Sequence, residues 1–157
     1  MKTIFGILTL VIIQAIWTVI VQPWRAEMAY SEYRKAGLKR DIPTAEQALL
    51  RALEFDSGNT MYRFRLAELY ATQPKMRPLA LAYTYSALEN NNGDIVIWGI
   101  LGLQGLLHFQ SGDVRGAKLS FERANWYYPE FEPAKKGLEQ VNKILSENSQ
   151  ILIKLGN

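Results

Sequence analysis

The hydrophobic positions of this chain follow two different patterns. From Thr3 to Val21 the sequence is an almost unbroken apolar run of about 19 residues, which is long enough to cross a bilayer as a helix. Beyond it, apolar and small residues recur three and four positions apart, as they do in amphipathic helices. The first pattern predicts a transmembrane helix, and the second predicts an all-α domain.

The end of the apolar run carries the residues expected at a membrane boundary. Trp17 and Trp24 lie where indole rings favour the headgroup region, and Pro23 with Arg25 is expected to close the helix. A cleaved signal peptide is the alternative, but no small-x-small cleavage site follows the run. We therefore expect an uncleaved anchor, with Trp17, Trp24 and the mid-membrane amide of Gln14 as its candidate contacts with lipid or another helix.

Three later stretches share one spacing of small and large residues. Each has a small residue at both ends and another side chain between them, at i, i+4 and i+7: Ala45–Leu49–Ala52, Ala80–Thr84–Ala87 and Ala117–Phe121–Ala124. The copies begin 35 residues apart (45 to 80) and 37 residues apart (80 to 117). Self-similarity at this period predicts a solenoid of helical repeats.

These stretches resemble the tetratricopeptide repeat (TPR) family, whose unit is a helix–turn–helix of about 34 residues. The third unit matches at Gly105, Gly112, Asp113, Ala117, Phe121, Ala124 and Pro129, and the second at Leu66, Ala67, Tyr70, Ala80 and Ala87. The resemblance covers residues 26–143. It implies an all-α, right-handed solenoid of about three helix–turn–helix units and a capping helix, preceded by a single transmembrane helix.

The turn and cap residues divide the chain further. We expect an anchor at 1–24, a repeat domain with its capping helix at 25–145, and a C-terminal tail at 146–157. The helices expected in the repeat domain are 26–38, one started by Asp41 and Pro43 with Thr44 and Gln47 in capping-box spacing, 60–72, 79–90, 95–109 capped by Asp94, and one beginning at Pro133. The apolar end of the tail either continues the last helix or forms an exposed hook; the sequence leaves both open.

The segment 95–109 is apolar on nearly every side. Gly99, Gly102 and Gly105 recur every three residues along it, and each lowers helix stability by roughly 1 kcal/mol relative to alanine. Close approach of another helix would offset that cost. The approaching element is either part of the same chain or a docked subunit or bilayer, and the sequence does not choose between them.

The sequence offers no catalytic constellation. There is no cysteine, the net charge is +3, and His108 is the only histidine. It is expected to be hydrogen bonded at the edge of the core, and we expect no catalytic residue, cofactor or metal. The basic residues are scattered, which argues against nucleic-acid binding. Trp126, Tyr127 and Tyr128 are expected to pack against the capping helix.

The TPR resemblance implies a concave groove lined by the first helix of each pair. The residues placed there are Met61, Phe64, Glu68 and Ala71 from the second unit, and Gly99, Gly102, Leu106 and Phe109 from the third. Such a groove is mostly apolar and suits a helix or hydrophobic segment of a partner. The resulting hypothesis is a non-enzymatic membrane adaptor that binds protein subunits of a membrane or envelope complex, or copies of itself.

The side of the membrane is set by two opposing signals. Basic residues after the run favour a cytoplasmic repeat domain, but folded domains cross membranes largely regardless of charge. The junction 22–27 also resembles the last span and external repeat tail of bacterial O-antigen polymerase/ligase-type proteins, which implies an extracytoplasmic domain. That resemblance gives the alternative function, an accessory of envelope polysaccharide biosynthesis, for which exposure of Trp98 and Trp126 is the discriminating observation.

Overall fold

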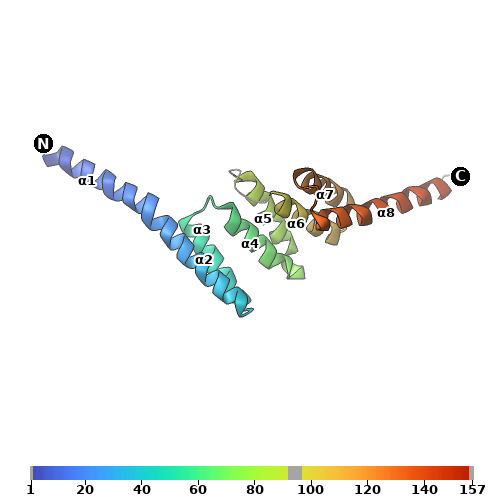
Figure 1. Ribbon diagram of the computed structural model, residues 1–157, viewed down its shortest axis with the longest axis horizontal. Helices are drawn as coiled ribbons and strands as arrows, with labels where there is room; N and C mark the ends of the chain where they lie inside the picture. The colour runs from blue at the N-terminus through green and yellow to red at the C-terminus, as the bar shows by residue number, and fades with distance from the viewer. Residues whose placement is uncertain (1, 92–96, 156–157) are drawn as a thin grey trace. The chain divides into compact units, whose positions relative to one another are not determined.

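The computed structural model describes the backbone of residues 2–91 and 97–155, and side chains within 7–91 and 97–151. All regular structure in these ranges is helical, as predicted (Figure 1). The elements are α1 (Lys2–Ile16), η1 (Trp17–Val21), α2 (Gln22–Leu38), α3 (Ile42–Phe55), α4 (Thr60–Ala71), η2 (Pro74–Met76), α5 (Arg77–Glu89), α6 (Ile97–Gln110), α7 (Val114–Tyr127) and α8 (Glu132–Leu155). The expected cap Asp94 lies outside the described residues.

The chain forms two compact units, Met1–Tyr62 and Arg63–Asn157. The division falls within α4. The first unit holds α1, η1, α2 and α3, and the second holds most of α4 and all later helices.

In the first unit the apolar run does not end at Pro23. The backbone stays helical from α1 through a π-helical turn into α2, and Figure 1 shows this as one continuous helix. Gln22 donates its N–H to the Trp17 carbonyl, five residues back. Pro23 follows directly, and the π turn before it accommodates the proline within the continuous helix. The predicted break between anchor and first repeat helix is therefore wrong.

The first helix pair packs through alanines. Ala26, Ala29 and Ala36 are buried on α2, facing the predicted stripe of α3, in which Ala45, Ala48, Leu49 and Ala52 are buried. Near the end of α2, Gly37 is exposed, whereas Ala36 is buried. At the edge of the pair, Glu32 of α2 is ion-paired with Arg51 of α3.

Asp41, and not Thr44, caps α3. The Asp41 carboxylate accepts a hydrogen bond from the Thr44 N–H at 3.2 Å and another from the Thr44 hydroxyl at 2.7 Å. These bonds lower the pKa of Asp41, the side-chain bond contributing most. The predicted capping box between Thr44 and Gln47 is wrong, because the N-cap is Asp41, which accepts the Thr44 N–H and also the Thr44 hydroxyl.

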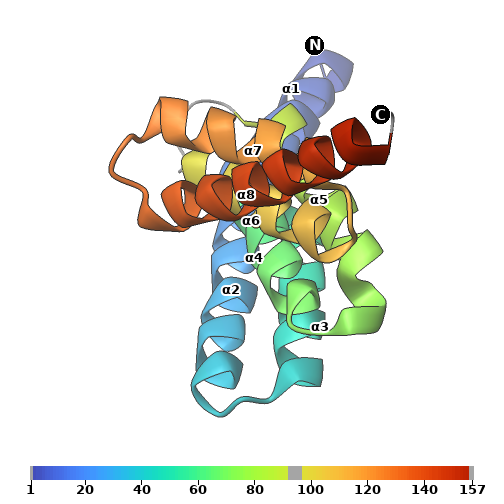
Figure 2. The ribbon, with the colours of Figure 1, turned by 90° about the vertical axis from the view of Figure 1, so that its right-hand side faces the viewer.

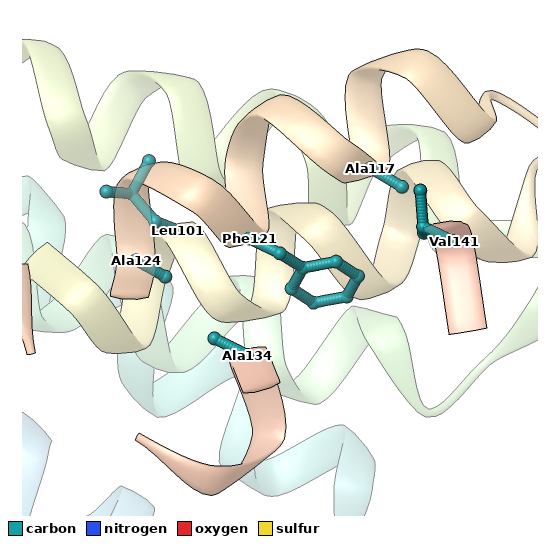
Figure 3. Close-up of a cluster of buried hydrophobic side chains, with 6 residues drawn as sticks. All are labelled: Leu101, Ala117, Phe121, Ala124, Ala134 and Val141. Carbon is teal, nitrogen blue, oxygen red and sulfur yellow. The ribbon is translucent and has the colours of Figure 1, made fainter. Parts of the chain in front are cut away.

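In the second unit each helix packs on the next. The rings of Tyr70 (α4) and Tyr83 (α5) lie 5.7 Å apart, α5 contacts α6, α6 contacts α7, and α8 covers both α6 and α7 (Figure 2). Figure 3 shows the core where α6, α7 and α8 meet. It consists of Leu101, Ala117, Phe121, Ala124, Ala134 and Val141.

The glycines of α6 make room for rings of the same chain. A Cβ placed on Gly105 would lie 2.6 Å from the Phe121 ring, and one placed on Gly137 of α8 would also lie 2.6 Å from it. The Phe121 ring thus occupies the space that the missing side chains of Gly105 and Gly137 leave between α6 and α8. A Cβ on Gly102 would overlap the Phe131 ring. For Gly102 and Gly105, packing within the chain is the correct alternative.

The C-terminal segment continues α8 as far as Leu155. Two serines in this part of the helix donate their hydroxyls to its own backbone, Ser146 to the Lys143 carbonyl at 2.7 Å and Ser149 to the Leu145 carbonyl at 2.8 Å. Of the two alternatives for the residues after 146, continuation of the helix is the one observed.

Candidate functional site

A cavity of about 580 Å³ opens in the second unit, between α4, α6 and the beginning of α8. Six of the eight predicted groove residues line it: Phe64, Glu68, Gly99, Gly102, Leu106 and Phe109. Ala71, in the last turn of α4, does not line it, and Met61 belongs to the first unit. The structure therefore brings together most of the residues that the TPR resemblance assigned to a groove.

Aromatic rings form the walls of the cavity. Besides Phe64 and Phe109, they are Trp98, Phe121 and Phe131. Trp98 is held in place because its ring lies 4.6 Å from that of Phe131 and 5.2 Å from that of Tyr128. Trp98 is thus packed into the wall, and the cavity volume falls within the range of about 300–1,000 Å³ that is usual for ligand sites.

Residues from the beginning of α8 complete the cavity, and the sequence reasoning missed them. They are Pro133, Lys136, Gly137 and Gln140. The amphipathic pattern of α8 predicted a cap, but not that one edge of the cap would face a cavity. Gly137, one turn after Pro133, was the available signal, because a small residue on a packed helix marks a close approach.

The polar groups of the cavity lie at its edge. Arg65 and Glu68 form an ion pair at 2.7 Å, and Lys136 is exposed. No group of three or more His, Asp or Glu side chains among the described residues could hold a metal ion. The arrangement can bind apolar groups and select for charge at the rim.

His108 has a structural place, as predicted. Its Nε2 lies 3.0 Å from the Tyr85 hydroxyl, and its Nδ1 lies 2.8 Å from Asp113 Oδ2. The other Asp113 oxygen accepts the Gly116 N–H at 2.9 Å, capping α7. This backbone bond is the main cause of a lowered pKa for Asp113. The histidine links α5, α6 and the start of α7.

The aromatic residues at the end of α7 do not pack as predicted. Trp126 is 75% exposed, and Tyr127 and Tyr128 are also exposed. Trp126 contacts Tyr127 edge-on, with ring centroids 4.8 Å apart. The outward position of Trp126 follows from its place on α7, since the buried face of that helix is already formed by Ala117, Phe121 and Ala124.

The N-terminal helix exposes its apolar side chains on every side. Every side chain from 7 to 20 is exposed, among them the predicted contact residues Gln14 and Trp17; Trp24 is exposed as well. The Thr18 hydroxyl donates a hydrogen bond to the Gln14 carbonyl at 3.0 Å. Among the described residues one helix, Ile7–Leu38, is long and apolar enough to cross a membrane, a test that a signal sequence also passes.

Arg25 marks the end of the apolar surface. Its guanidinium carbon lies 5.3 Å from the centre of the Trp17 ring and 5.4 Å from that of Phe55. The first buried residue of the chain's described part is Ala26, directly after this arginine. The change from exposed apolar surface to packed helix pair therefore occurs within one turn.

Comparison with solved structures decides the fold. The first TPR of Spaghetti (RPAP3) bound to an HSP90 peptide superposes with a TM-score of 0.71 at 17% identity, over 79% of this chain and 95% of that one. The Arabidopsis OM64 TPR domain superposes with a TM-score of 0.70 at 15% identity, over 78% of this chain and 98% of that one. The Sgt2 TPR domain from Aspergillus fumigatus superposes with a TM-score of 0.68 at 20% identity, over 80% of this chain and 82% of that one.

The chain has the fold of a TPR domain. No family model and no curated protein matches the sequence. At these identities the likeness shows architecture alone, so the TPR-like chain's partner has to be argued from its own surface.

Proposed function

We propose that this chain is a membrane-tethered TPR-like scaffold that binds an apolar segment of a partner protein in the cavity of its second unit. The observation that supports this proposal is the apolar cavity. In a TPR-like fold, such a cavity suits the binding of a protein segment better than catalysis. The scaffold would hold subunits of a membrane or envelope complex together, or join copies of this chain.

The character of the cavity favours a hydrophobic segment over a charged tail. One of the similar TPR domains holds the acidic peptide SRMEEVD, but here the walls are aromatic rings and glycines, with Lys136 and the Arg65–Glu68 pair at the edge. Burying two large apolar side chains contributes roughly 3–6 kcal/mol. A helix with anchors one turn apart supplies them in one element.

The tether is supported by the exposed apolar helix. A soluble helix exposing apolar side chains on all sides from 7 to 20 would be unstable in water, whereas a bilayer solvates it. We keep the extracytoplasmic side as the proposed location of the repeat domain. The alternative of a polysaccharide accessory would be supported by exposure of both Trp98 and Trp126. Trp126 is exposed, but Trp98 packs against two rings, so the alternative is less well supported.

Photo-crosslinking in native membranes tests the proposal. A benzoylphenylalanine at Leu106, a cavity residue that is also exposed, should give a discrete crosslinked protein. The same group at Ala82, an exposed residue of α5 outside the cavity, is the matched control. Leu103→Glu, which places a charge in the cavity, should abolish the crosslink from 106. Equal crosslinking from both positions, or none from 106, would contradict the proposal.

A further inference from the structure

We propose that the outer face of α7 is a second binding surface, which docks on an anionic membrane. This face is defined by Arg115, Leu119, Arg123 and Trp126. The inference rests on the membrane tether of the proposed function, but it concerns a different surface from the cavity.

The four residues form one stripe along the helix. At about 100° per residue, Arg115, Arg123 and Trp126 all lie within about 40° of Leu119, on the side opposite the buried Ala117, Phe121 and Ala124. Trp126 is 75% exposed and Leu119 59% exposed. Two of the most exposed large apolar side chains of the second unit therefore share one helix face with two arginines.

The charges of this face are not neutralised by the chain. Glu122, the acidic residue of α7, pairs with Lys118 at 3.7 Å, and the carboxylates after α7, Glu130 and Glu132, both pair with Lys135. Among the described residues, no ion pair involves Arg115 or Arg123. The stripe presents two free guanidinium groups beside an indole and a leucine.

This combination fits a lipid surface. Tryptophan favours the headgroup level, leucine enters the acyl boundary, and arginine is attracted to anionic headgroups. The binding energy of four side chains is small, but a tether in the same bilayer replaces free diffusion by a high effective concentration. A weak surface then suffices to hold the domain against the membrane.

A protein partner fits the face less well. A specific protein interface takes roughly 20–30 residues a side, which is far more than this stripe offers. A second copy placed on the same face by two-fold symmetry would set arginines against arginines, which disfavours the pairing. Anionic lipid is the occupant that the charges and the size of the face both support.

The test uses the full chain in lipid nanodiscs. The sequence has no cysteine, so Leu119→Cys gives one labelling site for an NBD fluorophore, and Ala82→Cys on α5 gives the control site. The discs contain phosphatidylcholine alone or with about one third phosphatidylglycerol. The label at 119 should shift to the blue and be quenched by brominated acyl chains in the anionic discs only, while the label at 82 should stay unchanged in both.

The arginines supply the variant arm. Removing each one should lower the docked fraction relative to the undocked fraction about fivefold, so Arg115→Gln with Arg123→Gln should abolish the blue shift while circular dichroism stays unchanged. An unshifted label at 119 in anionic discs overturns the proposal and leaves the tether standing. A shift that appears only on adding more protein means that the face binds a copy, which also overturns it. Failure of the chain to copurify with any disc overturns both the tether and the docking face.

Discussion

Gly105→Ala tests most sharply whether the glycines of α6 serve the chain's own packing. On an open helix face, alanine would stabilise by roughly 1 kcal/mol relative to glycine. At position 105, however, the added methyl would lie 2.6, 2.7 and 2.9 Å from Cδ1, Cε1 and Cγ of Phe121. Normal carbon contacts are about 3.5–4.0 Å, so the ring has to move.

The Phe121 ring is also closely approached from α8. On its other edge, the ring atoms lie 2.6–2.8 Å from the position of a Cβ on Gly137, and the ring itself is 4% exposed. Overpacking of a filled core costs about 1–3 kcal/mol. Allowing for the gain in helix propensity, Gly105→Ala should destabilise the protein by up to about 2 kcal/mol, whereas alanine at an open helix position should stabilise it.

The assay is equilibrium unfolding of the full chain in detergent micelles, followed by circular dichroism at 222 nm. Gly37→Ala is the matched control, because nothing lies within 4 Å of its added Cβ, and it should be neutral or stabilising. Gly105→Ala combined with Phe121→Leu should be more stable than the sum of the single changes by about 1 kcal/mol. A Gly105→Ala protein more stable than wild type, as expected for alanine on an open helix face, would refute the packing account and indicate that these glycines form an open docking surface.

Three further predictions concern other contacts. Asp113→Asn should remove the stabilisation that comes from the lowered pKa of Asp113. In the wild type this stabilisation is complete above the unfolded pKa of 3.8 and is lost as pH falls through the lower folded pKa. The free energy of unfolding of the variant should therefore fall less steeply at acid pH than that of the wild type. Tyr85→Phe, which removes the bond to His108, should cost about 1 kcal/mol in denaturant unfolding without changing helix content; an unchanged midpoint would contradict this. Pro23→Ala should leave the helix intact, because the chain is already helical across Pro23; the helical signal of the wild type and the variant should match by circular dichroism, and a gain of helix would show that the proline breaks it.

Local signals in the sequence were sufficient for the repeat helices. Small residues at i and i+7 become buried wherever they recur, so Ala45, Ala80 and Ala117 are all at most 1% exposed. Gly and Pro mark most helix ends for the same local reason. The groove residues followed from the resemblance, because a shared backbone geometry places Phe64 and Leu106 on one cavity whatever their side chains are.

The rest depended on contacts between distant residues. Gly102 and Gly105 carry no information about which ring approaches them, because Phe131 and Phe121 lie later in the chain. Pro23 reads as a helix end because the π turn that accommodates it has no sequence signature of its own. Trp126 was expected to pack against the capping helix, but the sequence already held the signal against it, because Trp126 lies on the opposite side of α7 from Ala117, Phe121 and Ala124.

The central claim, that the chain holds a partner through its apolar cavity, is tested most directly by the mass of the particle extracted from native membranes. Wild-type chain extracted in mild detergent should elute in multi-angle light scattering as a discrete complex with protein mass well above 17.9 kDa, and Leu106→Arg should release it as a folded monomer. A wild-type chain that elutes as a monomer, or a complex whose mass is unaffected by Leu106→Arg, would contradict the account.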